Sequence, residues 1–274
     1  MIGLLLLIIQ SVQAQPQWLR SDFEHPKGVF IVAHGLNTKP EKMNSLGHFL
    51  NSLGYDVYRL ALPGHYGDIT EMKTVTKEKW LTAALDGYQI AEARAQELKQ
   101  PLYYLGFSMG SLIGETLIAN HPELQLPEKI IHLAPALGIR SRSHLVKVLG
   151  IFGSEFIVNS KSPEVYKAQK GVSIAAYKAL FTLENELIEN KSSARINIPT
   201  LIYINEDDQL ISIKGLRKFI ALKKWTKSSL RPITDQKPKD ELTFSHRIID
   251  EYSLGEVAWK RITNEISAFL TDTK

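Results

Sequence analysis

The sequence feature best suited to covalent chemistry is Gly106-Phe107-Ser108-Met109-Gly110, a Gly-x-Ser-x-Gly motif. An apolar run that predicts a strand precedes it and a run that predicts a helix follows, so the chain must turn within a few residues. The turn forces Ser108 into a strained backbone conformation, while the missing Cβ atoms of Gly106 and Gly110 let strand and helix pass closely. We therefore expect the Ser108 hydroxyl to project from a sheet edge, above a helix N-terminus that favours developing negative charge. The alternative is a glycine-rich turn without a catalytic role.

A serine hydroxyl is a weak nucleophile and needs a base, which in turn needs a group to hold it. On a parallel sheet the functional side chains lie at the carboxyl ends of the strands. Asp208 follows a predicted strand over residues 199–205, and His246 lies in a loop beyond a predicted last strand. The chain order Ser108, Asp208, His246 is the order typical of a Gly-x-Ser-x-Gly turn on such a sheet.

Other residues compete for the acid and base roles. Asp207 is adjacent to Asp208, and since neighbouring side chains point in different directions, only one of them can face His246. Asp235 is a weaker alternative acid. The remaining histidines precede the serine, fall inside a predicted strand or the insertion, or have surface-like surroundings: His25, His34, His48, His65, His121, His132 and His144.

Acyl transfer also requires hydrogen-bond donors for an oxyanion. The backbone N–H of Met109, directly after the serine, is one candidate. The loop after the first main strand should supply the other, and we assign the N–H of Leu36, which follows His34-Gly35. A backbone donor explains why an apolar residue can occupy position 36. We expect His34 and Gly35 to support this loop, the alternative for His34 being a structural turn residue.

The rest of the chain alternates strands and helices, which predicts an α/β fold with a mostly parallel sheet flanked by helices. Further strands are predicted at 28–37, 55–62, 130–137 and 229–234, the last at a sheet edge because it contains Pro232. Helices are predicted at 39–53, 76–98, from the serine to about 120, at 213–222 and at the C-terminus.

The alternation stops between residues 138 and 198, a stretch that looks helical, notably over 145–152 and 163–188, and has no convincing strand. We interpret it as a helical cap inserted into an α/β core formed by residues 15–137 and 199–274.

Residues 1–14 resemble a signal peptide. An apolar run, Ile2 to Ile9, precedes Val12-Gln13-Ala14, and the short side chains at positions 12 and 14 predict cleavage after Ala14. The run is too short to span a bilayer, and no Lys or Arg precedes it. We expect export to the periplasm or beyond; the alternative is a buried or disordered extension of a cytoplasmic protein.

Composition excludes several classes of chemistry. The 274 residues contain no cysteine, which rules out disulfides, thiolate catalysis and cysteine metal sites. The net charge of +4 is mild, and no run of Lys and Arg suggests binding to nucleic acid.

These motifs together resemble the α/β-hydrolase superfamily and, within it, the lysophospholipase, monoacylglycerol-lipase and serine-aminopeptidase-like branch. The segments that carry the resemblance cover the chain from about residue 28 to its end apart from the cap: Val32–Leu36, Arg59–His65, Trp80, Gly106–Gly110, Ala134–Ala136, Asn205–Asp208 and His246–Asp250.

The resemblance also selects among the acids. The family pattern Gly-x-x-Asp matches Asn205-Glu206-Asp207-Asp208 and implies that Asp208 is the acid, with Asn205 in place of glycine. Two more departures are Tyr66, which interrupts the usual Leu-Pro-Gly-His-Gly sequence, and Arg247, which follows the base where the family commonly has an apolar residue. We expect Arg247 to alter the surface contacts of its loop.

The resemblance implies hydrolysis of a carboxylic ester through an acyl-serine intermediate, with no metal or organic cofactor. The apolar cap should shape a pocket for the apolar acyl group of a small-molecule ester, and it is compatible with peripheral contact to a lipid or membrane surface. Peptidase or thioesterase activity is the alternative, since the same residues serve each. Glu184, Glu186 and Glu189 could hold a peptide amino terminus, although their spacing favours a solvated helix face. A binding protein without activity is the remaining alternative.

Overall fold

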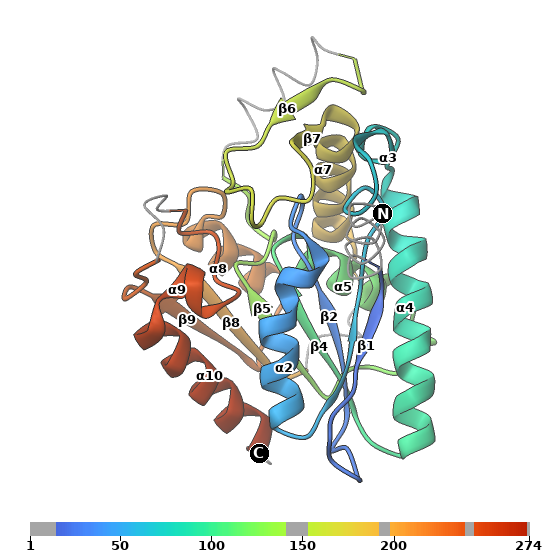
Figure 1. Cartoon of the computed structure of the whole chain (residues 1–274), viewed down its shortest axis with the longest axis vertical. Helices are drawn as coiled ribbons and strands as arrows, with labels where there is room; N and C mark the ends of the chain where they lie inside the picture. The colour runs from blue at the N-terminus through green and yellow to red at the C-terminus, as the bar shows by residue number, and fades with distance from the viewer. Residues whose placement is uncertain (1–14, 141–152, 192–197, 239–243, 273–274) are drawn as a thin grey trace, which may run out of the picture.

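The computed structural model describes residues 15–140, 153–191, 198–238 and 244–272 (Figure 1). The expected signal segment 1–14 and the stretch 145–152 lie outside these ranges, so export stays a prediction. Among the described residues, no helix has the length and apolar character that a bilayer crossing requires.

A mostly parallel sheet forms the centre of the molecule, as the sequence predicts (Figure 1). Its strand order within the described chain is β1-β3-β2-β4-β5-β8-β9, and only the pairing of β1 with β3 is antiparallel. Strands β2, β4, β5 and β8 are buried along their whole length, which explains their nearly continuous apolar sequences. The strands are β1 Gln17–Leu19, β2 Val29–Ala33, β3 Asp56–Arg59, β4 Leu102–Phe107, β5 Lys129–Leu133, β8 Thr200–Asn205 and β9 Ser228–Ile233.

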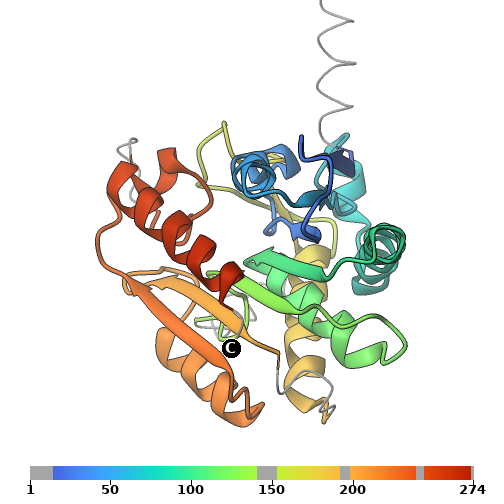
Figure 2. The ribbon, with the colours of Figure 1, turned by 90° about the horizontal axis from the view of Figure 1, so that it is seen from below.

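Helices cover both faces of the sheet (Figure 2). Alternate side chains of β2 enter two separate cores: Ile31 faces the first and Phe30 the second. The first core includes residues of α4 Lys77–Leu98, α5 Met109–Asn120, α7 Ile174–Glu189 and α8 Ile213–Leu222. The second includes residues of η1 Pro40–Met43, α2 Asn44–Ser52, α9 Glu251–Leu254 and α10 Glu256–Thr271. A short helix, α3 Ile69–Lys73, follows β3.

Several predicted boundaries are confirmed to within a residue or two. Helix α4 begins where the Thr76 hydroxyl accepts a hydrogen bond from the Lys79 N–H, and it ends at Lys99 in a left-handed conformation. Strand β9, which contains Pro232, lies at the sheet edge. Strand β1 was not predicted; it has three residues, and its Trp18 packs edge-on against Tyr58 with ring centroids 4.9 Å apart.

The inserted segment is not wholly helical. Its helix α7 begins at 174 instead of 163, because the Ser173 hydroxyl caps it by accepting from the Ala176 N–H. Two short strands, β6 Ile157–Asn159 and β7 Gly171–Ser173, pair antiparallel in the same segment, so the expectation of an insertion without strands was wrong. A Cβ at Gly171 would lie 2.4 Å from the Val158 carbonyl oxygen, so the pairing depends on that glycine. Figure 1 shows β6, β7 and α7 together at one end of the molecule.

Candidate active site

Ser108 occupies the turn between β4 and α5 in the strained conformation that the motif predicts. Its φ of 51° and ψ of −113° are rare for a residue with a side chain. Two hydrogen bonds hold the turn: the Ser108 N–H donates to the Leu133 carbonyl over 2.9 Å, and the Ala136 N–H donates to the Ser108 carbonyl over 3.1 Å. The strain is therefore sustained by the neighbouring strand β5 and the loop that follows it.

The glycines of the motif are required by close backbone contacts. A Cβ at Gly106 would lie 2.6 Å from the Ser111 backbone nitrogen, and one at Gly110 would lie 2.4 Å from the Ala33 carbonyl oxygen. Either contact would force strand and helix apart. Larger residues at these positions would thus displace the Ser108 hydroxyl.

Ser108, His246 and Asp208 form a continuous chain of hydrogen bonds. The His246 Nε2 lies 2.9 Å from the Ser108 Oγ, and its Nδ1 lies 2.8 Å from the Asp208 Oδ2. All three residues are buried, with the serine 9% exposed. A carboxylate at Nδ1 can only accept, so the imidazole proton resides on Nδ1 and the Nε2 lone pair faces the serine hydroxyl. This arrangement can take a proton from Ser108.

The structure also distinguishes the competing acids. The Asp208 Oδ1 accepts hydrogen bonds from the Leu210 and Ile211 N–H groups over 2.7 and 2.8 Å, which fixes the carboxylate and leaves Oδ2 for His246. Asp207 is exposed, and Asp235 pairs with Arg261 over 2.6 Å. Asp208 is therefore the acid that the structure brings to the histidine.

Asn205 contributes to this selection from the position where the family usually has glycine. Its Oδ1 accepts from the Asp207 N–H over 2.7 Å, and its Nδ2 donates to the Gln236 Oε1 over 2.6 Å. The Asn205 side chain thus organises the turn that separates the two aspartates.

The loop after β2 brings Leu36 against the serine. A Cβ at Gly35 would lie 2.8 Å from the Phe107 ring and 3.1 Å from the Ser108 Cβ, so the loop packs directly on the turn. The Gly35 carbonyl accepts from the His34 Nδ1 over 3.0 Å and from the Thr38 N–H over 3.2 Å. Since these bonds fix one side of the Gly35–Leu36 peptide, they also fix the direction of the Leu36 N–H. Met109 follows Ser108 directly and is the first residue of α5.

His34 and His65 form a buried pair behind this loop, with ring centroids 4.5 Å apart. The His34 Nε2 accepts from the Leu62 N–H over 3.0 Å, and the His65 Nδ1 lies 3.1 Å from both the Leu62 and Pro63 carbonyls. Burial lowers the pKa of His65 to about 4 and holds the pKa of His34 well below its usual range, with the neighbouring His65 as a further cause. Both rings are neutral at pH 7, and their hydrogen bonds to backbone groups hold the loops after β2 and β3 in place.

The other histidines lie away from this site. His132 is buried in β5 with its Nε2 2.6 Å from the Glu115 Oε1, as expected of a core residue with a polar partner. His25 and His48 are exposed, and the His121 Nδ1 lies 2.8 Å from the Glu123 Oε1. His144 lies outside the described residues.

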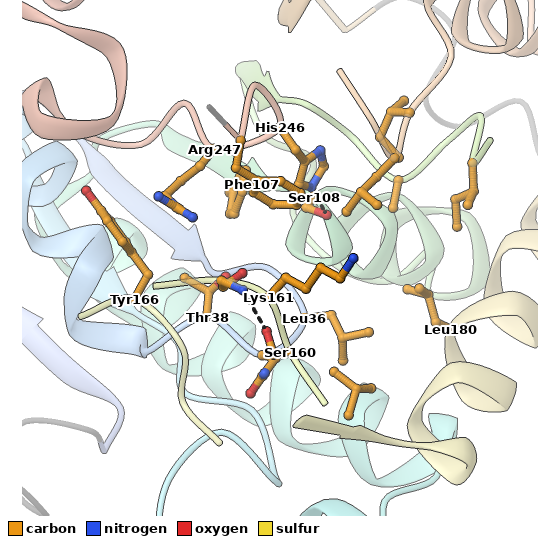
Figure 3. A pocket seen from close by; sticks show the side chains of 18 of the residues that line it. Leu36, Thr38, Phe107, Ser108, Ser160, Lys161, Tyr166, Leu180, His246 and Arg247 are labelled. Carbon is orange, nitrogen blue, oxygen red and sulfur yellow. Dashed lines mark hydrogen bonds between the residues drawn. The ribbon is translucent and has the colours of Figure 1, made fainter. Parts of the chain in front are cut away.

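A cavity of about 360 Å³ opens beside Ser108 and His246 (Figure 3). Much of its wall is apolar and comes from the inserted segment, through Val172, Tyr177, Leu180 and Phe181. Its size falls in the range of small-molecule sites. Among the described residues, no group of three or more His, Asp or Glu side chains could hold a metal ion.

The polar part of this cavity, which includes Arg247 and Tyr166, was not predicted from the sequence. Arg247 is only 4% exposed, so it does not modify the loop surface as expected. Its guanidinium lies 4.1 Å from the centroid of the Tyr166 ring, and the Tyr166 hydroxyl donates to the Asp250 carboxylate over 2.8 Å. Position 247, an arginine in place of an apolar residue, was the one available signal.

The glutamates of α7 do not reach the cavity. Glu184 is buried and accepts a hydrogen bond from the Ile139 N–H over 3.2 Å, which corrects the expectation that it lies on a solvated face. Glu186 pairs with Lys77 of α4, and both Glu186 and Glu189 are exposed. Helix α7 thus presents apolar side chains to the cavity and its acidic groups elsewhere.

Comparison with known proteins adds a family match over more than half of the chain. The profile of the family described as serine aminopeptidase, S33 matches residues 24–179. No curated protein matches the sequence.

Solved structures share the fold at low sequence identity. A soluble variant of monoglyceride lipase from Saccharomyces cerevisiae has a TM-score of 0.73 at 14% identity, over 93% of this chain and 90% of that one. A monoacylglycerol lipase from Paleococcus ferrophilus has a TM-score of 0.64 at 16% identity, over 93% and 98% of the two chains. Est1E from Butyrivibrio proteoclasticus, with bound ferulic acid, has a TM-score of 0.60 at 14% identity, over 93% of each chain. At these identities the similarity concerns the fold.

Proposed function

This chain belongs to the serine aminopeptidase S33 family of α/β-hydrolases, and on this premise we propose that it cleaves carboxylic esters through an acyl-serine intermediate. The observation that carries the proposal is the position of His246, whose two ring nitrogens lie within 2.9 Å of the Ser108 hydroxyl and the Asp208 carboxylate. This geometry suits a base that activates a serine and is itself held by an acid.

In the first half of the reaction, the Ser108 Oγ attacks the ester carbonyl carbon while its proton passes to the His246 Nε2. Asp208 keeps the imidazole in the productive tautomer and stabilises the imidazolium that forms. The proton then moves from Nε2 to the leaving alcohol as the C–O bond breaks. The product of this half is an acyl group esterified to Ser108.

The tetrahedral intermediate carries negative charge on the former carbonyl oxygen. We assign the backbone N–H groups of Leu36 and Met109 as its donors, supported by the packing of the Gly35–Leu36 loop on the Ser108 turn and by the place of Met109 directly after the serine. One such donor typically contributes on the order of 3 kcal/mol to the transition state. His34 contributes indirectly, since its bond to the Gly35 carbonyl orients the peptide that bears the Leu36 N–H.

The second half repeats these steps with water as the nucleophile. His246 takes a proton from the water, which attacks the acyl carbon, and returns the proton to the Ser108 Oγ as the acid leaves. Because every group involved belongs to the protein, the cycle needs no cofactor.

We assign the apolar wall of the cavity to the acyl group. Leu180 and Phe181 of α7 and Val172 of β7 offer contacts that suit a hydrocarbon chain and not a polar one. The names of two structural relatives, a monoglyceride lipase and a monoacylglycerol lipase, are consistent with this substrate class. We propose that residues 138–198 act as the cap that selects the substrate.

The family name favours a peptidase as the second candidate. An aminopeptidase needs a carboxylate to hold the amino terminus of its substrate, and the described residues that line the cavity include no Asp or Glu. A thioesterase would use the same serine, histidine and aspartate, and is distinguished by assay with a thioester.

The test is hydrolysis of p-nitrophenyl esters of increasing chain length by the wild type and by Ser108→Ala. We expect activity to rise with chain length until the cavity is filled, and to fall to background in the variant. Activity in Ser108→Ala equal to that of the wild type would contradict the mechanism. Equal activity at every chain length would contradict only the assignment of the apolar wall.

A further inference from the structure

A positive φ is found at five of the described residues other than glycine: Asn37, Lys99, Ser108, Ala134 and Lys224. Lys99 and Lys224 lie at the C-terminal ends of α4 and α8, where this conformation is an ordinary way for a helix to end. The other three lie together, because Ser108 bonds to the residue before Ala134 and packs against the loop that contains Asn37. Unusual backbone conformations gather at functional sites. Asn37 has a polar side chain there to which the proposed mechanism gives no role.

Asn37 is the third residue of a tight turn, Gly35 to Thr38, that follows β2. The Thr38 N–H closes the turn by donating to the Gly35 carbonyl over 3.2 Å, and the φ of Asn37 is 55°. A turn with a left-handed third residue favours glycine or asparagine at that position, since a short polar side chain tolerates this conformation. The dihedral angles of Asn37 place the Thr38 N–H against the Gly35 carbonyl and so hold the Gly35–Leu36 peptide. The direction of the Leu36 N–H therefore depends on Asn37.

The Asn37 side chain is buried and bonds twice to a single residue of the inserted segment. Its Nδ2 donates to the Gln169 carbonyl over 3.0 Å, and its Oδ1 accepts from the Gln169 N–H over 2.8 Å. The Asn37 carbonyl also accepts from the Ala168 N–H over 3.0 Å. Because donor and acceptor belong to one planar amide, the two side-chain bonds fix both its position and its direction. Together the three bonds hold Asn37 in the conformation that the turn needs.

The backbone that Asn37 contacts is anchored by bonds that do not involve Asn37. The Tyr166 hydroxyl donates to the Asp250 carboxylate over 2.8 Å, which ties this stretch to the residue that caps α9. The Gln169 Nε2 donates to the Gly67 carbonyl over 3.2 Å, which ties it to the loop after β3. This stretch of the inserted segment is therefore a fixed support for the Asn37 side chain.

We propose that Asn37 is a positioning residue for the oxyanion donors: its side-chain bonds to Gln169 keep the turn in the form that directs the Leu36 N–H to the ester carbonyl oxygen. This inference rests on the proposed ester hydrolysis and on Leu36 as one of the two donors. Because the groups that Asn37 bonds are backbone groups, the role belongs to Asn37 and not to particular side chains of the inserted segment.

A purely structural role for Asn37 predicts a different outcome. If Asn37 only joined the inserted segment to the core, its loss would lower the free energy of unfolding and would affect substrates of the same shape alike. A positioned N–H instead acts on one atom, the carbonyl oxygen, and most strongly in the transition state. Replacing that oxygen by sulfur, a weaker acceptor, removes most of this stabilisation and leaves the acyl chain and the leaving group unchanged.

The test compares p-nitrophenyl butanoate with its thiono analogue, in which sulfur replaces the carbonyl oxygen. The quantity of interest is the ratio of kcat/KM for the ester to that for the thionoester. The variants are Asn37→Gly, which keeps the left-handed conformation without the side-chain bonds, and Asn37→Asp, which has the same shape but whose carboxylate cannot donate to the Gln169 carbonyl. Asn51→Asp is the matched control: the Asn51 Nδ2 also donates to backbone carbonyls, those of Leu19 and Tyr55, and Asn51 is not among the described residues that line the cavity.

We expect a wild-type ratio of about 100 or more, reduced about tenfold in Asn37→Gly and at least as much in Asn37→Asp, because misdirecting one donor removes part of its contribution. The change should come from the ester, with kcat/KM for the thionoester within about threefold of the wild type. Asn51→Asp should lower the midpoint of urea unfolding and keep the wild-type ratio. Urea unfolding of the Asn37 variants shows whether each is folded under the assay conditions.

A wild-type ratio near one, or the wild-type ratio retained in Asn37→Gly, would overturn the proposal. If Asn37→Gly does not fold, Asn37→Asp gives the result in its place, since aspartate also tolerates the left-handed conformation. Each of these outcomes leaves ester hydrolysis standing, because the wild type still cleaves the ester. Failure of ester hydrolysis itself looks different: the wild type would cleave neither substrate faster than Ser108→Ala.

Discussion

The sheet edge that carries Ser108 and the inserted segment 138–198 face each other across the cavity, and they are built in different ways. At the sheet edge each polar side chain has a fixed partner: His246 contacts both Ser108 and Asp208, and the oxygens of Asp208 are all occupied. The inserted segment contributes an apolar wall and one exposed lysine. From this difference we propose that the reaction and the choice of substrate are encoded in separate parts of this chain.

The two regions should respond differently to substitution, because different kinds of contact hold them together. Hydrogen bonds among buried polar groups are directional, so changing one member at the sheet edge disables the set. Apolar contacts are non-directional and nearly additive in area, so the cap can be altered in steps. Variants at the sheet edge should therefore lose activity, and variants in the cap should redistribute it.

The largest effect is expected for Asp208→Asn. The Asp208 Oδ1 already accepts two backbone N–H groups, so the amide oxygen should take that position and turn the NH2 group toward His246. This would leave the imidazole proton on Nε2, where it cannot accept from Ser108. We expect kcat/KM for a p-nitrophenyl ester to fall about 10⁴-fold.

Asp207→Asn is the matched control for that variant, since Asp207 is adjacent and exposed. Its kcat/KM should stay within about twofold of the wild type, because surface substitutions away from the site change little. Comparable losses in both variants would mean that the acid has been misassigned, and the contrast between sheet edge and surface would fail.

An intermediate effect is expected from the buried histidines of the sheet edge. The pKa of His65 is lowered to about 4 in the folded protein from 6.5, so the unfolded chain binds the additional proton first as the pH falls. The stability that the neutral ring provides is fully present above about pH 6.5 and lost by about pH 4, a change on the order of 3 kcal/mol. His34 titrates in the same direction.

The variant His65→Asn tests this dependence, because its amide can still donate to the Leu62 carbonyl and has no proton to gain. Urea unfolding measured between about pH 7 and pH 4.5 should show a smaller loss of stability in the variant than in the wild type. Parallel curves would show that His65 does not contribute to acid sensitivity.

The smallest effect is expected in the cap. Leu180→Trp should shorten the apolar wall, reducing kcat/KM for the longest esters about tenfold while sparing the shortest, since a few methylene contacts are lost. Thr182→Trp, exposed on the same helix, provides the control and should leave the chain-length profile unchanged. A uniform loss across all chain lengths in Leu180→Trp would indicate that the cap supports the reaction itself.

The contrast between the sheet edge and the inserted segment also explains which features could be predicted from the sequence. The turn at Ser108 was predictable because two glycines and a strand-to-helix transition leave few alternatives. The chain order pointed to Asp208 and His246 as a candidate pair, and the structure joins their side chains by a hydrogen bond. The choice between Asp207 and Asp208 needed a family pattern, because two adjacent carboxylates give no periodic signal. The structure resolves it through the two N–H groups that bind Asp208.

The cap was less predictable for physical reasons. Strands β6 and β7 have three residues each, too few for an alternating pattern to register, and their pairing depends on contact between segments distant in sequence. Arg247 was assigned to the surface because a single arginine carries no information about its surroundings. Its burial depends on Tyr166, some eighty residues earlier in the chain, which only the folded structure brings near.

Active-site labelling shows whether Ser108 is the nucleophile. Intact protein is treated with a fluorophosphonate and the modified residue is located by tandem mass spectrometry, with Ser111→Ala as control, since Ser111 lies three residues after Ser108 and its hydroxyl donates to the Gly106 carbonyl. We expect one adduct, on Ser108, present in the wild type and in Ser111→Ala and absent in Ser108→Ala. An unlabelled wild type, or labelling that persists in Ser108→Ala, would contradict it.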